Sequence, residues 1–314
     1  MVNTLIVALL PIIFTMLLGY ISGKIGSFDN KTSGILSKLV MSYALPLSLF
    51  WQLNQMSASA ITANAHIAFW LLVIMLGWWI VVYLVSHHAA KGSVVISALR
   101  AFSISVPAIL FVGPALITQL YPKNSAMAIS LGGLMMSCIL PLTLVVLATT
   151  NEENANKSGW SKLMGAILSA FKTPVVIAEL LGFVTALLNI HFPAMLENTF
   201  TQLGKASAGV GLFLIGLILY YNKPSFSKAV WINVICKEIL VPFSAFVLLS
   251  VTGQKTDFIN EITLIMAISE IMFPSILAQQ YGEGQRELSS SMFVSTILSI
   301  FILAAIIILR GITI

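Results

Sequence analysis

Long apolar stretches, each close to the length of a membrane-spanning helix, recur along almost the whole chain. A helix needs about 20 apolar residues to cross a bilayer, and short polar connections separate ten stretches of about that length. The pattern therefore predicts an all-α integral membrane protein with ten transmembrane helices and no sizeable soluble domain. The ten stretches run near residues 3–23, 33–52, 66–86, 93–120, 124–149, 165–190, 203–221, 229–250, 259–281 and 288–310.

The most polar run in the chain, Asn151–Ser158, divides these stretches into two sets of five. Because five is an odd number, the second set enters the membrane from the side opposite to the first. The count predicts a five-plus-five inverted repeat within one transmembrane domain. Residues 1–150 would form the first repeat, residues 151–162 a cytoplasmic connecting loop, and residues 163–314 the second repeat.

Proline interrupts the fourth stretch of each half at a matching place, in Ser103–Leu110 and in Ser269–Leu277. Proline within a helix lacks a backbone donor and clashes with the preceding turn. Lipid cannot satisfy the freed backbone groups, so such breaks persist only inside protein or along a cavity. Paired interruptions in the two halves of a membrane protein indicate a transporter binding site.

The interruptions predict a site for an anion. Because proline favours the first turn of a helix, Pro107 and Pro274 would start new half-helices, whose free N–H groups carry partial positive charge. If the repeats are inverted and the segments cross, two such ends meet near the membrane midplane. Ser103, Ser105 and Ser275 would add hydroxyl donors to a carboxylate. The alternative is a pair of ordinary proline kinks, with the serines bonded to the backbone.

Three charged residues within the stretches are candidates for chemistry, because a charge in the bilayer is costly without a partner. Arg100 would bind substrate, pair with an acidic residue, or extend to the cytoplasmic surface. Glu270, one turn before Pro274, would couple transport to a proton or form a fixed salt bridge. Lys237 would point toward the broken helices and help to neutralise the substrate, or pair structurally within the bundle.

Two further acidic residues, Glu179 and Glu238, also fall inside predicted helices. Structural pairing within the bundle is the interpretation we favour for both. The glycines at 209, 211 and 216 favour close contact between helices.

The composition supports an integral membrane protein, and the distribution of charge predicts which loops face the cytoplasm. The chain is 58% hydrophobic and 9% charged, against roughly 25% charged residues in soluble domains. Its net charge of +5 comes from residues spread through loops, so nucleic acid is not an expected partner. Nine basic residues fall at odd-numbered loops and four on the other side. This places the odd loops in the cytoplasm and both termini outside a cell membrane. The nine are Lys24, Lys31, Lys91, Lys157, Lys162, Lys172, Lys223, Lys228 and Arg286, and the four are Lys123, Lys205, Lys255 and Arg310.

Motifs for enzymatic chemistry are absent from the sequence. It contains no His-Glu-x-x-His or Cys-x-x-Cys pattern, no glycine-rich phosphate loop and no nucleophile elbow. We therefore expect no enzyme activity, no cofactor and no metal site. Without an ATP-hydrolysing module, active transport would draw on an ion gradient or on the gradient of the substrate itself.

Several segments, in order along the chain, resemble the auxin efflux carrier family. The resemblance covers nearly the whole chain in length, order and loop size. It rests on Leu17–Tyr20, Lys38–Phe50, Gly209–Leu217, Lys237 followed by Pro242, Ala278–Gly282, Ser289–Ser291 and Ser295-Thr296. The resemblance implies ten helices in a five-plus-five inverted repeat, with crossing broken helices four and nine. Bacterial relatives move small organic anions such as malate and malonate, and a homodimer is what the resemblance suggests.

These observations favour a secondary carrier for mono- or dicarboxylates, with Glu270 coupling transport to a proton or to sodium. The first alternative is a sodium–proton or other cation antiporter of related architecture, which would need acidic residues clustered at the crossing. The second alternative is a membrane scaffold or sensor subunit that transports nothing. The sequence identifies neither the substrate nor the direction of transport.

Overall fold

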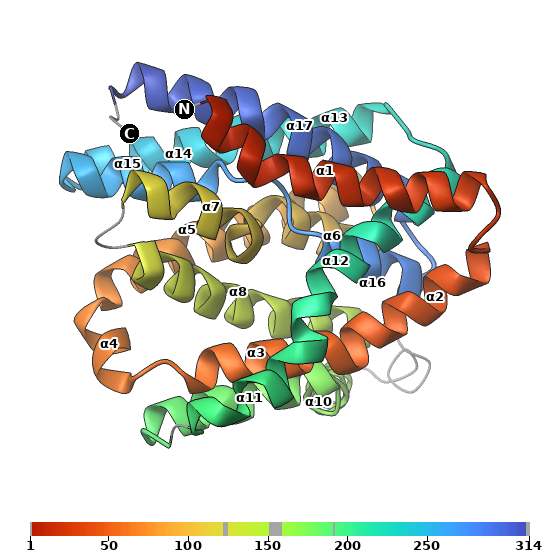
Figure 1. Ribbon diagram of the computed structural model, residues 1–314, viewed down its shortest axis with the longest axis horizontal. Helices are drawn as coiled ribbons and strands as arrows, with labels where there is room; N and C mark the ends of the chain where they lie inside the picture. The colour runs from red at the N-terminus through yellow and green to blue at the C-terminus, as the bar shows by residue number, and fades with distance from the viewer. Residues whose placement is uncertain (1, 122–124, 151–158, 191, 312–314) are drawn as a thin grey trace.

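The computed structural model is helical throughout the residues it describes, which are 2–121, 125–150, 159–190 and 192–311 (Figure 1). No β-strand occurs among these residues; the one β-type pairing is an isolated bridge between Pro107 and Glu270. This confirms the predicted all-helical class. The N- and C-terminal ends of the described chain lie near each other at the same end of the molecule (Figure 1).

Each of the ten predicted stretches falls on a helix or on a set of consecutive helices. Two short elements were not predicted, α4 (Ala58–Ala63) and the 3₁₀ turn η3 (Ala194–Leu196). In chain order, the ten segments are α1 (Val2–Lys24); α2 (Asn30–Leu39), η1 (Val40–Ala44) and α3 (Leu45–Asn54); α5 (Ala65–Leu84) and η2 (Val85–Ala89); α6 (Val94–Ser105) and α7 (Ile109–Leu120); α8 (Ser125–Ala148); α10 (Gly159–Phe171) and α11 (Pro174–Leu187); α12 (Glu197–Asn222); α13 (Lys228–Ile235), η4 (Cys236–Leu240) and α14 (Val241–Val251); α15 (Thr256–Met266) and α16 (Phe273–Tyr281); and α17 (Gln285–Leu309).

Within the described residues, five helical segments are long and apolar enough to cross a membrane, and six if the bent pair α10–α11 is one span. The interrupted segments do not reach this length, because α6, α7, α15 and α16 contain 12, 12, 11 and 9 residues. The structure therefore supports a multi-pass membrane protein. The count of ten spans and the inverted repeat remain predictions.

The sixth predicted stretch, residues 165–190, is not one straight helix. It consists of the end of α10 and all of α11, which meet at an angle of 76°. Pro174 occupies the first turn of α11, where its missing N–H costs nothing, and the two residues before it form the turn. The helix α10 begins at Gly159, so residues 159–162 of the predicted connecting loop are helical. Residues 151–158 of that loop lie outside the described part of the chain.

Two proline residues impose a widened turn on otherwise continuous helices. In a regular α-helix the ring of Pro46 would clash with the carbonyl of Ser42, four residues earlier. The π-turn η1 ends just before this proline, and the Leu45 N–H bonds to the carbonyl of Val40, five residues back. The same arrangement precedes Pro242, where η4 contains Lys237 and Glu238. A π-turn inside a helix often marks a functional site.

The helices pack into two groups. The first, which we call the flanking unit, contains α1, α2–α3, α11 and α12; α12 contacts α1 and α3, and α3 contacts α11. The second, the broken-helix unit, contains α5 to α8 and α13 to α17, with close pairs α5–α6, α7–α8, α14–α15 and α13–α17. Each group takes its members from both halves of the chain. The units meet where α17 contacts α1 and α12 and where α1 contacts α7 (Figure 1), and α10 contacts both α8 and α11.

Glycines allow the backbones of α1 and α12 to touch. A Cβ atom added to Gly216 would lie 1.8 Å from the carbonyl oxygen of Met16, and one added to Gly19 would lie 1.9 Å from that of Phe213. At Gly211 the clash would be with Met272 of the broken-helix unit, at 2.6 Å. The prediction of close helix contact is confirmed at 211 and 216, and it is wrong at Gly209, which has open space around it.

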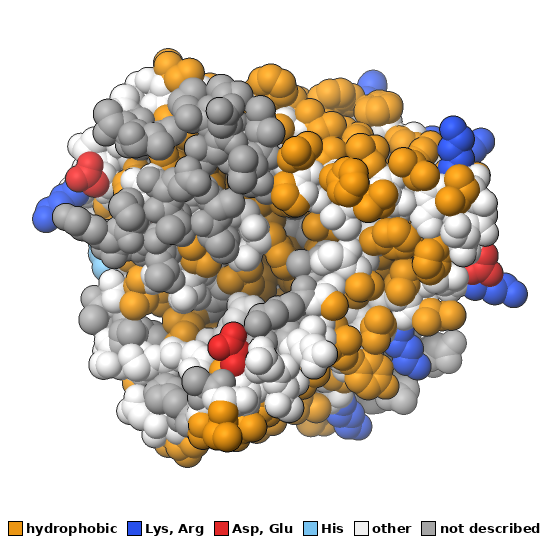
Figure 2. Space-filling view, viewed as in Figure 1, with side chains coloured by type: hydrophobic (Ala, Val, Ile, Leu, Met, Phe, Trp, Pro, Cys, Tyr) orange, Lys and Arg blue, Asp and Glu red, His pale blue; other side chains and the backbone are white. Residues whose placement is uncertain are grey.

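The outer surface is strongly apolar, as a lipid-facing surface requires. Large hydrophobic side chains are exposed along α1, α5, α11 and α14. The face drawn in Figure 2 shows a broad field of orange over α1 and its neighbours, with most of the Lys and Arg side chains in view near one end, where α1 turns into α2 (Figure 1). At this turn Asp29 caps α2 by accepting the hydroxyl and the backbone N–H of Thr32, and these bonds lower the pKa of its carboxyl.

Candidate functional site

The two interrupted segments touch at their breaks. The helix α6 ends at Ser105 and α7 begins at Ile109, whereas α15 ends at Met266 and α16 begins at Phe273. Between them, Pro107 and Glu270 form an antiparallel backbone bridge. The N–H of Ala108 donates to the carbonyl of Ser269 at 2.9 Å. Each break therefore satisfies part of the other's freed backbone, as the lipid interior demands.

The two prolines act in different ways. Pro274 lies in the first turn of α16, as predicted. Pro107 does not start α7; it lies two residues before Ile109, in the extended bridge to Glu270. The expectation that it begins a half-helix is therefore wrong by two residues. An extended conformation before and at the proline is what its ring favours, and the residue before it, Val106, has φ −109° and ψ 118°.

Glu270 is fully buried and is held by serine residues. The hydroxyl of Ser103 donates to one carboxyl oxygen at 2.7 Å, and that of Ser291 donates to the other at 2.6 Å. The backbone N–H of Glu270 donates to the hydroxyl of Ser295 at 2.9 Å. The predicted residues Ser103 and Glu270 therefore meet directly, across the two breaks. Hydrogen bonds of this kind compensate for the water that the carboxyl loses on burial.

Two further buried charged residues, Lys237 and Glu238, lie next to Glu270 on the widened turn η4. The Ser295 hydroxyl donates to Glu238 at 2.5 Å, so one serine links the backbone of Glu270 to the carboxyl of Glu238. The ammonium of Lys237 donates to the carbonyl of Met266 at 3.2 Å, and both carboxyls act on its charge. Met266 is the last residue of α15, and a cation is favourable where a helix ends. Lys237 thus points toward the broken helices, as predicted.

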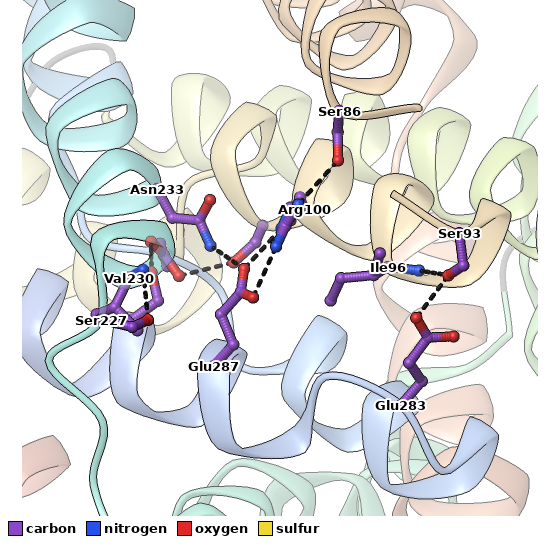
Figure 3. Close-up of polar contacts among 12 residues, drawn as sticks. Ser86, Ser93, Ile96, Arg100, Ser227, Val230, Asn233, Glu283 and Glu287 are labelled. Atoms are coloured by element: carbon purple, nitrogen blue, oxygen red, sulfur yellow. Dashed lines mark hydrogen bonds and ion pairs between the residues drawn. The ribbon is translucent and has the colours of Figure 1, made fainter. Parts of the chain in front are cut away.

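Arg100 is paired with an acidic residue, which is one of the roles that the sequence left open. Its guanidinium donates to both carboxyl oxygens of Glu287, at 2.6 and 2.7 Å, and to the hydroxyl of Ser86 at 3.1 Å. The amide of Asn233 also donates to Glu287, at 2.9 Å. Figure 3 shows this network joining α6, η2, α13 and α17.

The start of α6 is also bonded to the segment between α16 and α17, through Ser93. The hydroxyl of Ser93 accepts the N–H of Ile96 at 3.1 Å, which caps the helix, and donates to Glu283 at 2.6 Å (Figure 3). Because Glu283 lies between α16 and α17, it connects the beginning of one broken segment to the end of the other. Together with Arg100 and Glu287, it holds the broken-helix unit together.

The remaining predicted residues, Ser105 and Ser275, are both buried. Ser105 is the last residue of α6, and its hydroxyl makes no hydrogen bond within the described structure. Ser275 lies in the first turn of α16, where its N–H donates to the carbonyl of Met272 at 3.1 Å. An unpaired buried hydroxyl costs roughly 1–3 kcal/mol, so the Ser105 hydroxyl is available to a ligand.

A cavity of about 260 Å³ begins beside the second half-helix of the first break. It lies between the flanking unit and the broken-helix unit, where α3 faces α7 and α8. Its size is close to the lower end of ligand pockets, roughly 300–1,000 Å³. Leu110, in the first turn of α7, is part of the wall, and the polar side chains are those of Gln52, Ser130 and Ser137. The full lining is Leu49, Gln52, Leu53, Met56, Leu110, Ile129, Ser130, Gly133, Leu134 and Ser137.

Sequence reasoning missed several of these residues. Glu287, Ser291 and Ser295 bond to Arg100, Glu270 and Glu238, respectively. From the sequence, the two serines were noted only within motifs of the family resemblance, and Glu287 was not noted. Their helical spacing was the available signal, because 287, 291 and 295 recur every four residues on one face of α17. No group of three or more His, Cys, Asp or Glu side chains suited to a metal ion occurs among the described residues.

Nearly the full length of the chain matches a known family. A family model described as "Membrane transport protein" matches residues 4–307. The chain belongs to this family. The match confirms the resemblance to the auxin efflux carriers, which are members of the same family, and it makes the protein a membrane transporter.

Two members of the family give the range of similarity. The "Uncharacterized transporter YfdV" of Escherichia coli (strain K12) is 27% identical over 292 residues, 92% of this chain and 92% of the relative. A "Putative malonate transporter" of Rhizobium meliloti (strain 1021) is 21% identical over 304 residues, 93% of this chain and 91% of the relative. Both alignments span nearly the whole of each protein.

Proposed function

We propose that the protein is a secondary active transporter of small organic anions, mono- or dicarboxylates such as malate or malonate, in the cell membrane. The observation that carries the proposal is the meeting of the two breaks beside the cavity at Leu110. The first turn of α7 borders this cavity through Leu110, and the first turn of α16 begins at the second break. The start of a helix favours an anion. A relative with malonate in its printed name adds support.

In this proposal the substrate carboxylate binds at the starts of α7 and α16, next to Pro107 and Pro274. The Ser105 hydroxyl has no hydrogen-bond partner among the described residues, and Ser275 adds a second donor. Lys237 and Arg100 supply positive charge near the breaks. Lys237 already donates to the Met266 carbonyl, and Arg100 already donates to Glu287. In this proposal each either attracts the substrate electrostatically from a distance or exchanges its present partner for the substrate.

Glu270 is the proposed coupling residue. A carboxyl with two serine donors, 0% exposed, can exist in the protonated or the ionised form if its partners rotate. The hydroxyl donors suit the carboxylate, and Lys237 nearby balances its charge. Binding or release of a proton at Glu270 would then change which position of the broken-helix unit, relative to the flanking unit, has the lowest free energy. Sodium at the same carboxyl is the alternative coupling ion.

Alternating access would come from movement of one unit against the other. The broken-helix unit is internally tied by the Arg100–Glu287 pair, whereas its boundary with the flanking unit contains the cavity. Each unit contains corresponding helices from both halves of the chain, which supports a five-plus-five inverted repeat with crossing broken segments. We place both termini outside and the odd-numbered loops in the cytoplasm.

A cation antiporter is the second candidate, favoured by one observation: Glu238 and Glu270 lie on either side of Ser295 and both are buried. Two buried acidic residues that contact the same serine, one through its backbone and one through its carboxyl, resemble the acidic cluster that such a carrier needs. Sodium-driven proton flux in the absence of any organic anion would support this candidate over the first.

Filling the cavity tests the proposed binding site. In proteoliposomes, the Ser130→Trp variant should lose most uptake of labelled malonate, by about tenfold or more, because the indole occupies a cavity of about 260 Å³. Ser250→Trp is the matched control, because Ser250 is exposed on α14, away from the cavity. Equal uptake by both variants would show that the substrate binds elsewhere.

A further inference from the structure

Glu179 in α11 is a buried acidic residue that has no charged partner among the described residues. It is 4% exposed, and neither carboxyl oxygen accepts a hydrogen bond or forms an ion pair within the described structure. Our expectation of structural pairing at this residue is therefore wrong. A buried carboxyl without partners is costly to any fold, which raises the question of what it binds.

The carboxyl faces an apolar groove of about 310 Å³ between α3, α8 and α11. Ser137 and Cys138 are the other side chains in the lining that carry a polar atom. The Ser137 hydroxyl interacts with the carboxyl but does not reach hydrogen-bond geometry. The remaining lining is apolar: Leu53, Leu134, Met135, Pro141, Phe171, Val176, Leu180 and Phe183.

In the part of the chain that the structure describes, the elements around the groove place no cation beside Glu179. The helices α3 and α8 contain no Lys, Arg, His, Asp or Glu, and the other titratable group on them is the Cys138 thiol. On η1 the titratable group is Tyr43. On α10, Lys162 lies nine residues before the groove residue Phe171, about 13 Å along the helix axis. Exposed Lys172 precedes α11 by two residues.

Charge and coordination together identify the ligand. An ionised carboxylate in this apolar setting would cost several kcal/mol, whereas the neutral acid fits it. The lining supplies side-chain oxygens from Ser137 and Glu179 alone, far fewer than the six or more that hard metal cations such as calcium take. A proton is the ligand that such a site can hold.

The position of the groove gives the proton a route. Leu53, Leu134 and Ser137 line both this groove and the cavity beside Leu110. The two therefore adjoin, with Ser137 at the boundary. Glu179 belongs to the flanking unit and Ser137 to the broken-helix unit, so movement between the units changes the surroundings of the carboxyl.

We propose that Glu179 is a second proton-binding site, separate from Glu270, at the boundary between the two units. The carboxyl is neutral while it faces the apolar groove, and it releases its proton to the adjoining cavity when α8 moves relative to α11. The role of this proton in transport rests on the proposed function, but proton binding at Glu179 can be tested without measuring transport.

A hydrophobic carbodiimide tests the site directly. Dicyclohexylcarbodiimide partitions into lipid and reacts with neutral carboxylic acids, and peptide mass spectrometry locates the adduct. We expect an adduct at Glu179 in the full-length protein that diminishes strongly between about pH 5 and about pH 9. The Glu179→Gln variant should lose this adduct, while N-ethylmaleimide should still modify exposed Cys138 in the same groove. Maleimide labelling without any carbodiimide adduct at low pH would overturn the proposal.

A transport measurement separates this inference from the proposed function. Malonate uptake by wild-type protein should vary with pH, and Glu179→Gln, which mimics the neutral acid, should flatten that profile. An unchanged profile in Glu179→Gln, with wild-type uptake intact, would overturn the role in proton movement alone. Absence of malonate uptake in the wild type would instead overturn the proposed function, and carbodiimide labelling would still decide whether Glu179 holds a proton.

Discussion

Replacing Glu270 with glutamine is expected to abolish accumulation of malonate driven by a proton gradient, with a loss of about 100-fold, or roughly 2.7 kcal/mol. The amide has the shape of the carboxyl, so Ser103 and Ser291 can keep their contacts by rotating their hydroxyls. The side chain can no longer exchange a proton or carry a charge. Coupling is therefore removed while the site is kept.

Counterflow distinguishes this outcome from simple damage. Exchange of labelled against unlabelled malonate needs binding and movement but no coupling, so it should survive in Glu270→Gln. Glu283→Gln is the matched control, because Glu283 also accepts a serine hydroxyl but lies between α16 and α17, at the end of the unit. If Glu270→Gln accumulates malonate as the wild type does, Glu270 has no coupling role.

Reversal of the charge on Arg100 is expected to cause the largest loss of stability. Arg100→Glu places two carboxyls where a bidentate pair now forms, with side chains only 19% and 17% exposed. Removing one partner of a buried pair costs about 3–5 kcal/mol. For this partly buried pair we expect the low end of that range, with the melting temperature in detergent falling by at least about 5 °C. The exchanged pair Arg100→Glu with Glu287→Arg should recover part of the loss.

Arg286→Glu is the control for this experiment. Arg286 is next to Glu287, but it is exposed and donates to backbone carbonyls of Lys223 and Pro224. Its reversal should change the melting temperature little, because exposed charges contribute at most about 1 kcal/mol. Equal losses from Arg100→Glu and Arg286→Glu would mean that the ion pair does not hold the unit together.

The helices could be predicted from the sequence because the bilayer imposes their length and composition. Each predicted stretch has a helical counterpart, and both interruptions were found from their prolines. The bend before Pro174 was missed, because the apolar pattern continues through the turn and hydropathy alone does not register it. The π-turns before Pro46 and Pro242 were missed for the same reason: they leave hydropathy unchanged.

The side-chain partners could be predicted only in part. Ser103 and Glu270 were both selected because each lies at a break, and they bond although 167 residues separate them. Arg100 and Glu287 are 187 residues apart, and Glu287 lies in the first turn of α17, where an acidic residue already has a local explanation at the helix start. Pairing of this kind depends on how α6 and α17 pack, which spacing along one helix does not reveal.

Malonate uptake by purified protein in liposomes, compared between wild type and the Pro107→Ala, Pro274→Ala double variant, tests the central claim most directly. Alanine restores a backbone donor and permits a continuous helix, which would remove the helix starts that we propose as the anion site. We predict saturable uptake by the wild type above protein-free liposomes, and loss of most of it in the double variant. Equal uptake by the two proteins would contradict the account.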